Sequence, residues 1–301
     1  MVTFFKKLLK RIQPSFGFTS CYYQNDGLAF NLACHELGII SIDIQHGSIS
    51  ELHRAYGRWN RIPDGGFELF PSVFWCWGEY EADIISQWNS KVEQWHQPFI
   101  GGNPWLSFWR KGADEIILYY QNIIRKMKNK LPRYQHILLA LQDTDNSLMS
   151  IKEAIRESPP DWFWWVRLHP ASMKEQKKIK NFFKDFPQDR VEFDMANDLP
   201  LPALIREMNV VITGWSSVVE EAEFFEIPSV VTHIFGTQLF KKEVISGCVL
   251  PAFTKEDLLN AIKKQIQKKK GDISFPKKFS LTTAKSIEEL LSLDNRLLKS
   301  F

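Results

Sequence analysis

The sequence predicts an α/β protein with two domains, each a parallel β-sheet covered by helices. Three observations lead to this fold class. The length of 301 residues is enough for two domains of ordinary size. Hydrophobic residues make up 44% of the chain and charged residues 24%, which is a globular composition. Short apolar runs alternate with amphipathic helical segments, the pattern of repeated strand–helix units in a parallel sheet.

The N-terminal domain is predicted over residues 1–131 and is short. Its apolar runs predict strands at Gly17–Tyr23, Ile39–Ile44, Val73–Trp77 and Pro98–Asn103. Helices are expected at Gly27–Leu37 and Asp114–Lys130, and the second ends before Pro132 because proline disfavours helix in the residue preceding it. The polar and aromatic segment Glu51–Pro71 is predicted to be irregular. A Rossmann-like domain ordinarily has more strand–helix units, so this one is minimal or begins partway through a longer ancestral domain.

The C-terminal domain is predicted over residues 132–301 and repeats the pattern more completely. Its strands are expected at His136–Leu141, Phe163–Leu168, Val191–Phe193, Val210–Thr213 and Ser229–Thr232. Its helices are expected at Leu148–Glu157, Lys174–Phe186, Leu201–Met208, Val218–Phe225, Lys255–Lys269 and Ser286–Leu298.

Charge and cysteine content exclude several classes of protein. The net charge of +3 is too small to indicate a nucleic-acid partner. The 4 cysteines lack CxxC spacing, which predicts free thiols in a reducing compartment, without a disulfide framework or a zinc site. No apolar run reaches the roughly 18 residues of a membrane span, so a cytoplasmic location is predicted. The basic amphipathic stretch Phe4–Ile12 is either a solvated helix face or a weak attachment to anionic lipid at the inner face of the membrane.

Polar residues follow several predicted strands, where ligands of open parallel sheets bind. The segment Gly214-Trp215-Ser216-Ser217 comes directly after the strand Val210–Thr213 and opens a helix. A glycine that admits close backbone approach, two hydroxyls and a helix N-terminus together predict a phosphate or diphosphate site. The alternative is simple N-capping, for which one serine is enough.

Two further groups belong to the same predicted donor-nucleotide site. Glu220 and Glu221 lie one turn into the helix, where a carboxylate can accept both ribose hydroxyls; the alternative is a pair of acids favoured by the helix dipole. Arg167, His169 and Pro170 lie at the end of another strand. The proline fixes a turn, the imidazole can donate to a phosphate, and the arginine supplies a second cation.

The N-terminal domain offers an acceptor side. Gln45-His46-Gly47 follows the strand Ile39–Ile44, and a histidine there is a candidate general base toward an acceptor hydroxyl. Gly47 leaves room for a substrate, and Gln45, His53 and Tyr56 are expected to line the same side. Asp26, between the first strand and its helix, is either a second catalytic candidate or an N-cap, and capping is favoured.

Two motifs in the C-terminal domain resemble those of known families. The Ser-Ser pair, the Glu-Glu-Ala run and a proline seven residues past Glu221 resemble the nucleotide-binding helix of GT-B glycosyltransferases and non-hydrolysing UDP-sugar 2-epimerases. That resemblance implies that Glu221 binds ribose. A His-Pro dipeptide combined with Ser-Ser resembles the bacterial sialyltransferases, polysialyltransferases and Kdo transferases, which use CMP-sugars. It implies that His169, Ser216 and Ser217 contact the nucleotide phosphate.

The N-terminal motifs resemble two families in different degrees. Gln45-His46-Gly47 is similar to the CDP-glycerol and CDP-ribitol phosphotransferases of teichoic acid synthesis, which implies that His46 is the base. Asn25-Asp26-Gly27 half matches the acidic pair and glycine of the CMP-sialic-acid enzymes, with Asn in place of the first acid. The resemblance extends over about Gly17 to Pro251 and implies a GT-B fold with a central cleft.

The predicted function is glycosyl transfer from a CMP-, CDP- or UDP-linked donor to a hydroxyl of a bacterial surface glycan, such as capsule, lipopolysaccharide or O-antigen. The partners are the nucleotide sugar and a glycan or lipid-linked glycan acceptor. No cofactor and no divalent metal is expected, although Asp143-Thr144-Asp145 has the letters of a metal-binding motif. The alternatives are a CDP-polyol phosphotransferase, a sugar-nucleotide 2-epimerase and a non-catalytic GT-B-like scaffold.

Overall fold

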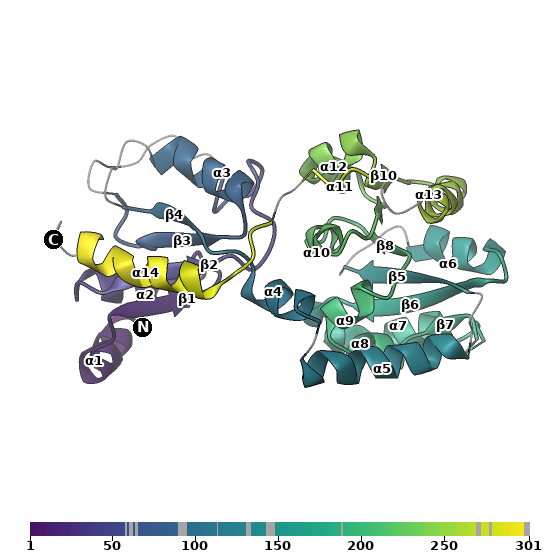
Figure 1. The fold of residues 1–301 in the computed structure, drawn as a ribbon, viewed down its shortest axis with the longest axis horizontal. Coiled ribbons are helices and arrows are strands. Elements are labelled where there is room, and N and C mark those ends of the chain that lie inside the picture. Colours follow the sequence, from purple (N-terminus) through teal and green to yellow (C-terminus); the bar gives the residue numbers. More distant parts are fainter. Residues whose placement is uncertain are drawn as a thin grey trace. The chain divides into compact units, whose positions relative to one another are not determined.

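The computed structural model describes residues 1–57, 59, 63, 66–89, 95–112, 114–130, 134–142, 148–187, 189–268, 272–276 and 279–297. The chain forms two compact units, which we call unit 1 (residues 1–107 and 277–301) and unit 2 (residues 108–276) (Figure 1). This division comes earlier in the chain than the predicted one at residue 132. The helix after Asp114 packs within unit 2, because Ile117 and Ile124 are buried there against the sheet. The C-terminal helix returns to unit 1.

Unit 1 contains a four-stranded parallel sheet in the order β1-β2-β3-β4. Its strands are β1 (Phe16–Thr19), β2 (Ile40–Ile44), β3 (Val73–Cys76) and β4 (Gln97–Ile100). The predicted first strand ran to Tyr23, but the observed one ends at Thr19 because Cys21 adopts a left-handed backbone with φ of 59°. The parallel pairing brings the carboxyl ends of β1 and β2 to the same edge, with Thr19 opposite Asp43.

Helices cover both faces of the unit 1 sheet. They are α1 (Val2–Ile12), α2 (Asn25–His35), α3 (Glu79–Asn89), α4 (Pro104–Arg110), which crosses into unit 2, and α14 (Ala284–Leu297). On one face Leu290 of α14 packs against Ile42 and Trp75. On the other, Ile84 and Ile85 of α3 pack against Phe74. α1 lies outside this layer and packs onto α2, with Leu9 against Ala33 and Cys34.

Unit 2 contains a six-stranded parallel sheet in the order β10-β9-β8-β5-β6-β7. Its strands are β5 (Gln135–Leu141), β6 (Trp162–Leu168), β7 (Val191–Glu192), β8 (Val210–Thr213), β9 (Ser229–Val231) and β10 (Val249–Pro251). The first five confirm the predicted strands to within one or two residues at each end, and β10 was not predicted. The chain as a whole thus has two parallel-sheet units, which confirms the predicted α/β fold class.

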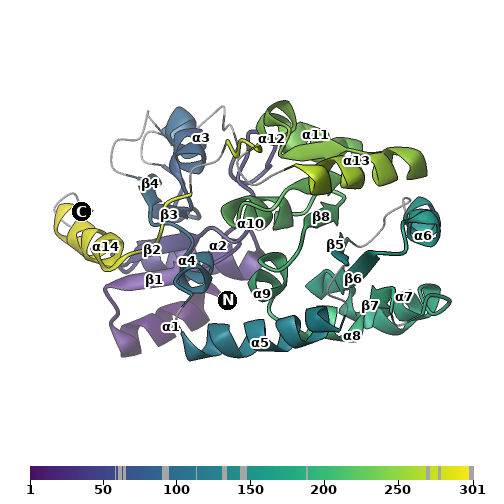
Figure 2. The same cartoon turned by 45° about the vertical axis from the view of Figure 1, so that its right-hand side comes forward.

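The unit 2 sheet is buried between two helical layers (Figure 2). Its helices are α5 (Glu115–Asn129), α6 (Leu148–Glu157), a 3₁₀ helix (Pro170–Glu175), α7 (Gln176–Phe182), α8 (Asp194–Asp198), α9 (Leu201–Ile205), α10 (Val218–Phe224), α11 (Ile234–Leu239), α12 (Lys241–Ser246) and α13 (Lys255–Gln267). α6 and α13 pack on one face through Ile155 and Ile262. α5, α9 and α10 pack on the other, where Leu204 and Ala222 meet Trp165.

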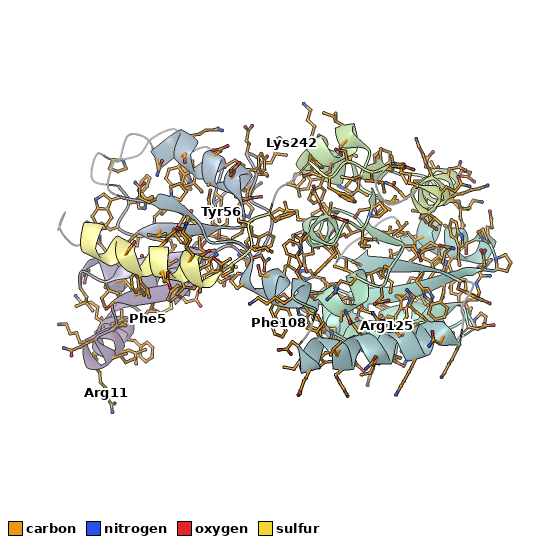
Figure 3. The ribbon with its side chains drawn as sticks, viewed as in Figure 1. Phe5, Arg11, Tyr56, Phe108, Arg125 and Lys242 are labelled. Atoms are coloured by element: carbon orange, nitrogen blue, oxygen red, sulfur yellow. The ribbon has the colours of Figure 1, made fainter. Side chains whose placement is uncertain are left out.

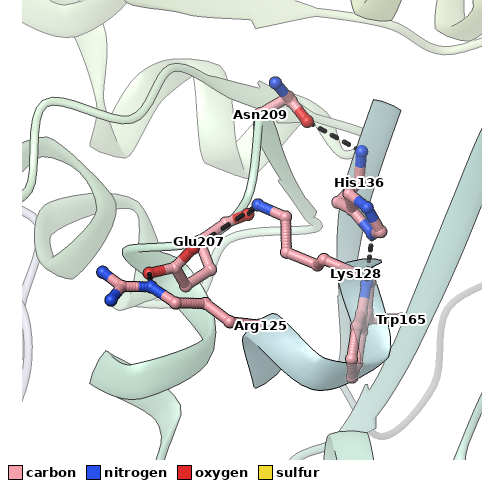
Figure 4. A network of polar contacts seen from close by, with 6 residues as sticks. All are labelled: Arg125, Lys128, His136, Trp165, Glu207 and Asn209. Carbon is pink, nitrogen blue, oxygen red and sulfur yellow. Dashed lines mark hydrogen bonds and ion pairs between the residues drawn. The ribbon is translucent and has the colours of Figure 1, made fainter. Parts of the chain in front are cut away.

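A polar network holds the amino end of the unit 2 sheet (Figure 4). The backbone N–H of His136 donates to Asn209 (2.7 Å), and the indole N–H of Trp165 donates to Nδ1 of His136 (3.2 Å). Glu207 pairs with Arg125 (3.6 Å) and Lys128 (3.5 Å) on α5. Burial lowers the pKa of His136 to about 4, so the ring is neutral at pH 7. This network is structural and lies at the edge opposite the predicted donor site.

Candidate functional site

The predicted base, His46, lies at the carboxyl edge of the unit 1 sheet and contacts a cysteine. The Sγ atom of Cys21 is 3.1 Å from Nε2 and 3.6 Å from Nδ1 of His46. Surrounding side chains lower the pKa of His46 below 6.5 by desolvation, although part of its ring reaches solvent. A neutral imidazole can accept a proton at pH 7. Cys21 was missed from the sequence, which gives no sign of its left-handed backbone.

Three other histidines, one in the loop after β2 and two just after strands of unit 2, have their tautomer fixed by the backbone. In His53, His169 and His233, Nδ1 accepts a hydrogen bond from the backbone N–H two residues later, at 3.1–3.2 Å. Neutral imidazole has one donor and one acceptor nitrogen, so Nε2 of each carries the proton. These three rings are therefore hydrogen-bond donors. His46 has no such backbone bond among the described contacts, which leaves it suited to accept a proton.

Asp43 ties the turn that carries Cys21 to the sheet. Its carboxylate accepts from the Tyr22 backbone N–H (3.1 Å) and from the Tyr56 hydroxyl (2.6 Å). Burial raises the pKa of Asp43 to about 7, and the two hydrogen bonds oppose that rise. Since both oxygens are used and the side chain is buried, Asp43 is a positioning residue rather than a group that meets substrate.

The structure brings the predicted acceptor-side residues together but gives two of them different surroundings. Gln45 is buried; its amide donates to the Gly47 carbonyl (2.9 Å) and accepts from the Trp77 N–H (2.7 Å). Tyr56 is also buried, and its hydroxyl serves Asp43. Both therefore shape the loop instead of lining open space. Gly47 and His53 are half-buried, as a substrate-facing position requires.

Asp26 is an exposed residue in the first turn of α2. The residue that precedes the helix is Gln24, so the structure does not place Asp26 at the N-cap, the role favoured from the sequence. One of its carboxylate oxygens accepts from the Gly27 N–H (3.0 Å). Gly27 itself is required by packing, since a Cβ there would lie 2.7 Å from the Tyr22 carbonyl oxygen. The start of α2 thus supports the turn at residues 21–23.

The predicted phosphate loop follows β8 at the carboxyl edge of the unit 2 sheet. Ser217 stands at the N-cap of α10, but its side chain makes no capping hydrogen bond. The Ser216 hydroxyl accepts from the Val218 N–H only at 3.4 Å, which is long for such a bond. Capping therefore engages these two hydroxyls weakly, and both are half-buried at the loop surface. They are available to an anionic ligand.

Neighbouring strands hold this loop in place. The Trp215 backbone N–H donates to the Gln142 side chain at the end of β5 (2.7 Å). The Trp215 ring lies 4.5 Å from the ring of His233, which follows β9. Gly236 allows α11 to approach, because a Cβ there would lie 2.2 Å from the Gly214 carbonyl oxygen. Sequence reasoning missed His233 and Gly236, although the position of His233 after a predicted strand could have indicated it.

Arg167 is the last residue but one of β6 and His169 follows the strand directly, and the two have different surroundings. One guanidinium nitrogen of Arg167 donates to the carbonyls of Ala196 and Leu199, both at 2.6 Å, so that nitrogen is committed to the backbone. His169 is exposed, caps the 3₁₀ helix that begins at Pro170, and presents its Nε2–H outward from the backbone. Of the two, His169 is the better donor to a phosphate.

The two glutamates of α10 differ in burial. Glu220 is buried, whereas Glu221 is half-buried. Desolvation raises the pKa of Glu221 to about 7, opposed by the charge of Arg167. The half-buried position of Glu221 in the first turn of α10 is the position of the ribose-binding carboxylate that the resemblance implies. Asp143-Thr144-Asp145 lies outside the described residues, and within the described ranges no group of three or more His, Cys, Asp or Glu side chains is arranged to hold a metal ion.

The basic N-terminal stretch forms helix α1, which has two apolar faces. Leu9 is buried against α2, while Phe4, Leu8 and Ile12 are 64%, 41% and 61% exposed and lie four residues apart on one face. Arg11 projects away from the unit at the end of this helix (Figure 3). Among the described residues, no helix has the length and hydropathy needed to cross a membrane.

No protein-family model matches the chain, and no curated protein sequence matches it. Solved structures do. The UDP-GlcNAc 2-epimerase of Neisseria meningitidis, bound to UDP-GlcNAc, is 14% identical with a TM-score of 0.63, over 97% of this chain and 79% of that one. The UDP-GlcNAc 2-epimerase of Methanocaldococcus jannaschii, in complex with UDP-GlcNAc and UDP, is 16% identical with a TM-score of 0.62, over 98% and 79%. A glycosyltransferase of kitacinnamycin is 13% identical with a TM-score of 0.54, over 100% and 76%.

At these identities the likeness concerns the fold. It confirms the predicted GT-B-like architecture of two parallel-sheet α/β units. The finer predicted resemblance to the CMP-sialic-acid and Kdo transferases does not appear among these structures.

Proposed function

We propose that this chain transfers a sugar from a nucleotide-activated donor to an acceptor hydroxyl, with unit 2 binding the donor nucleotide and unit 1 supplying the base. One observation carries the proposal. In His53, His169 and His233 the protonated nitrogen is fixed by the backbone, and of the four histidines compared only His46 is suited to accept a proton. His169, a fixed donor, follows β6, and the serine loop follows β8, so both lie at the same edge of the unit 2 sheet.

In the proposed reaction, the acceptor oxygen attacks the anomeric carbon of the donor while its proton passes to His46. The bond between that carbon and the phosphate oxygen breaks, and the leaving phosphate keeps the electron pair. Hydroxyls of Ser216 and Ser217 and the Nε2–H of His169 donate to the leaving oxygens. Fixed donors directed at developing negative charge are the usual main source of such stabilisation.

Glu221 supports a nucleotide rather than an inorganic phosphate as the ligand. It lies one turn beyond the serines on α10, with a pKa raised to about 7. A carboxylate one helical turn beyond a phosphate-binding loop can accept hydrogen bonds from the two ribose hydroxyls of a bound nucleotide. The acceptor class we propose is a bacterial surface glycan or its lipid-linked precursor, as the motif resemblance suggests.

The second candidate is a UDP-sugar 2-epimerase, which the solved structures favour because two of the three described above carry that activity. Epimerisation at C2 requires a base that removes a carbon-bound proton from the sugar. His46 is suited to be that base, but the two acids beside the same edge give little support for a second catalytic group. Asp43 is buried with both oxygens occupied, and Asp26 is bonded to its own helix.

The two candidates are separated by incubating the chain with UDP-GlcNAc in deuterated water and following the sugar by proton NMR. An epimerase incorporates deuterium at C2 and produces the epimer without any acceptor. The proposed transferase leaves C2 protonated, and releases nucleotide faster when an alkyl glucoside is added as a model acceptor. The assay is repeated with CMP- and CDP-linked donors.

His46→Gln is the diagnostic variant, and His35→Gln, at the end of α2 in the same unit, is the matched control. The proposal expects the first to abolish transfer and the second to retain it. Exchange at C2 would replace the proposal by the epimerase. Transfer that survives in His46→Gln would remove the assigned base.

A further inference from the structure

A pocket of about 710 Å³ opens in unit 1 beside the histidine site, and its walls are mainly aromatic. The ring-bearing residues are Tyr22, Tyr23, Trp59, Phe67 and Phe70. They support one another edge to face: the ring of Phe70 lies 5.0 Å from the rings of both Tyr22 and Trp59. The volume is within the range of pockets that hold a small organic ligand.

The polar ends of these rings are already occupied by the protein. The Tyr22 hydroxyl and the Trp59 indole N–H both donate to the carbonyl of Ala55. Among the described residues, the rest of the lining consists of Leu28, Ala55, Gly66 and Leu69 and the charged residues Arg54 and Glu68. The pocket therefore presents ring and alkyl carbon, which offers a sugar few partners for its hydroxyls but suits an apolar group.

The pocket and the proposed base share one turn of the chain. Cys21, which contacts His46, is followed directly by Tyr22 and Tyr23 of the pocket wall. The Tyr23 ring centroid lies 6.4 Å from that of His46 and 5.8 Å from that of His53. A ligand held in the pocket is thus adjacent to the two imidazoles.

We infer that this pocket binds the apolar aglycone of the acceptor, an alkyl chain or hydrocarbon ring attached to the sugar whose hydroxyl reacts. The inference rests on the proposed transfer to an acceptor hydroxyl. It narrows the acceptor to an amphiphile, in which the aglycone occupies the aromatic pocket and the hydroxyl reaches His46.

The test is binding of methyl, propyl and butyl β-glucosides to the whole chain, measured calorimetrically without nucleotide. Each buried methylene contributes about 0.8 kcal/mol, which is about fourfold in affinity. Affinity should rise up to about 60-fold from methyl to butyl. In the same titration, NMR signals of the His46 and His53 rings should shift and that of His169 should not.

A matched pair of variants locates the binding. Leu69 lines the pocket and is 43% exposed, while Leu281 is 44% exposed and lies outside it in the same unit. Leu69→Asp should abolish the dependence on chain length, and Leu281→Asp should retain it. Affinity independent of chain length, or equal loss in both variants, would overturn the inference. Because no nucleotide is present, this result is independent of whether unit 2 binds a donor.

Discussion

The carboxyl edges of the two sheets share one packing feature, a glycine that lets a helix approach a loop, but they present different functional groups. In each unit a glycine lets a helix lie close to the loop after a strand: Gly27 of α2 approaches Tyr22 after β1, and Gly236 of α11 approaches Gly214 after β8. The unit 1 edge then presents a neutral histidine, a thiol and aromatic rings. The unit 2 edge presents hydroxyls and an imidazole N–H donor.

The contacts of one histidine at each edge are the basis for the proposed division between proton acceptance in unit 1 and anion binding in unit 2. In unit 2 the ring nitrogen of His169 that would accept a proton is bonded to the backbone, so the outward nitrogen is a donor. In unit 1 the corresponding strand-end histidine, His46, faces a sulfur atom instead. In the proposed function, this difference in a single backbone contact is the reason for a basic role at one edge and a hydrogen-bond-donor role at the other.

Removing the base should give the largest effect. His46→Ala is expected to lower kcat by about 10²–10⁴-fold, the usual contribution of general base catalysis. Since burial lowers the pKa of His46, the rate of the parent chain should rise through a pKa below 6.5 and be constant at pH 7. The pH–rate profile checks this, and a rise centred above pH 7 would contradict the assignment.

Acid should destabilise both units through buried histidines. Burial lowers the pKa of His96 in unit 1 and of His136 in unit 2 to about 4. A depressed histidine pKa means that the unfolded chain binds the proton more readily, so stability is constant above pH 6.5 and falls as the pH drops toward 4. Each site accounts for up to about 3 kcal/mol. His136→Gln retains an acceptor for Trp165 and should reduce the pH dependence of the free energy of unfolding between pH 6.5 and 4, measured by denaturant titration at each pH. An unchanged pH dependence would argue against a neutral buried ring.

The two close-packed glycines sharpen the comparison between the edges. Gly236→Ala should displace the Gly214 loop and weaken nucleotide binding about tenfold, because a hydrogen bond to a charged group is worth about 1.5–3 kcal/mol. Gly27→Ala should displace the turn at residues 21–23 and lower the rate without changing nucleotide affinity. Nucleotide affinity is measured for both variants by calorimetric titration. An equal loss of affinity in the two would contradict the expectation that only the unit 2 edge binds the nucleotide.

The smallest effect is expected at α1. Its exposed apolar face and basic residues predict weak binding to anionic vesicles, weakened several-fold by Phe4→Ser and by 0.5 M salt. Vesicle sedimentation measures it, with Phe253→Ser, an exposed phenylalanine of unit 2, as control. Equal binding of neutral and anionic vesicles would contradict the predicted contribution of the basic residues of α1.

The sequence predicted most strands because buried parallel strands are continuous apolar runs, as in Trp162–Val166. It missed α3, whose apolar residues are interspersed with aromatic and acidic ones. It also missed the short elements α4, α8, α11, α12 and β10, which have at most seven residues each. It also indicated the serine loop, His169 and His46, because each follows a strand. It could not indicate Cys21 or the buried positions of Tyr56 and Asp43, since these depend on a left-handed residue and on contacts between separate loops.

The central claim is that the unit 2 edge binds a nucleotide through its serine loop. The most direct test is calorimetric titration of the chain with UDP, CDP and CMP, using Ser216→Ala and Ser217→Ala, and Ser246→Ala as a control elsewhere in the unit. We expect binding of at least one nucleotide, weakened about tenfold by each loop variant and unaffected by the control. A folded chain that binds none of the three, or binds equally well in all variants, would contradict it.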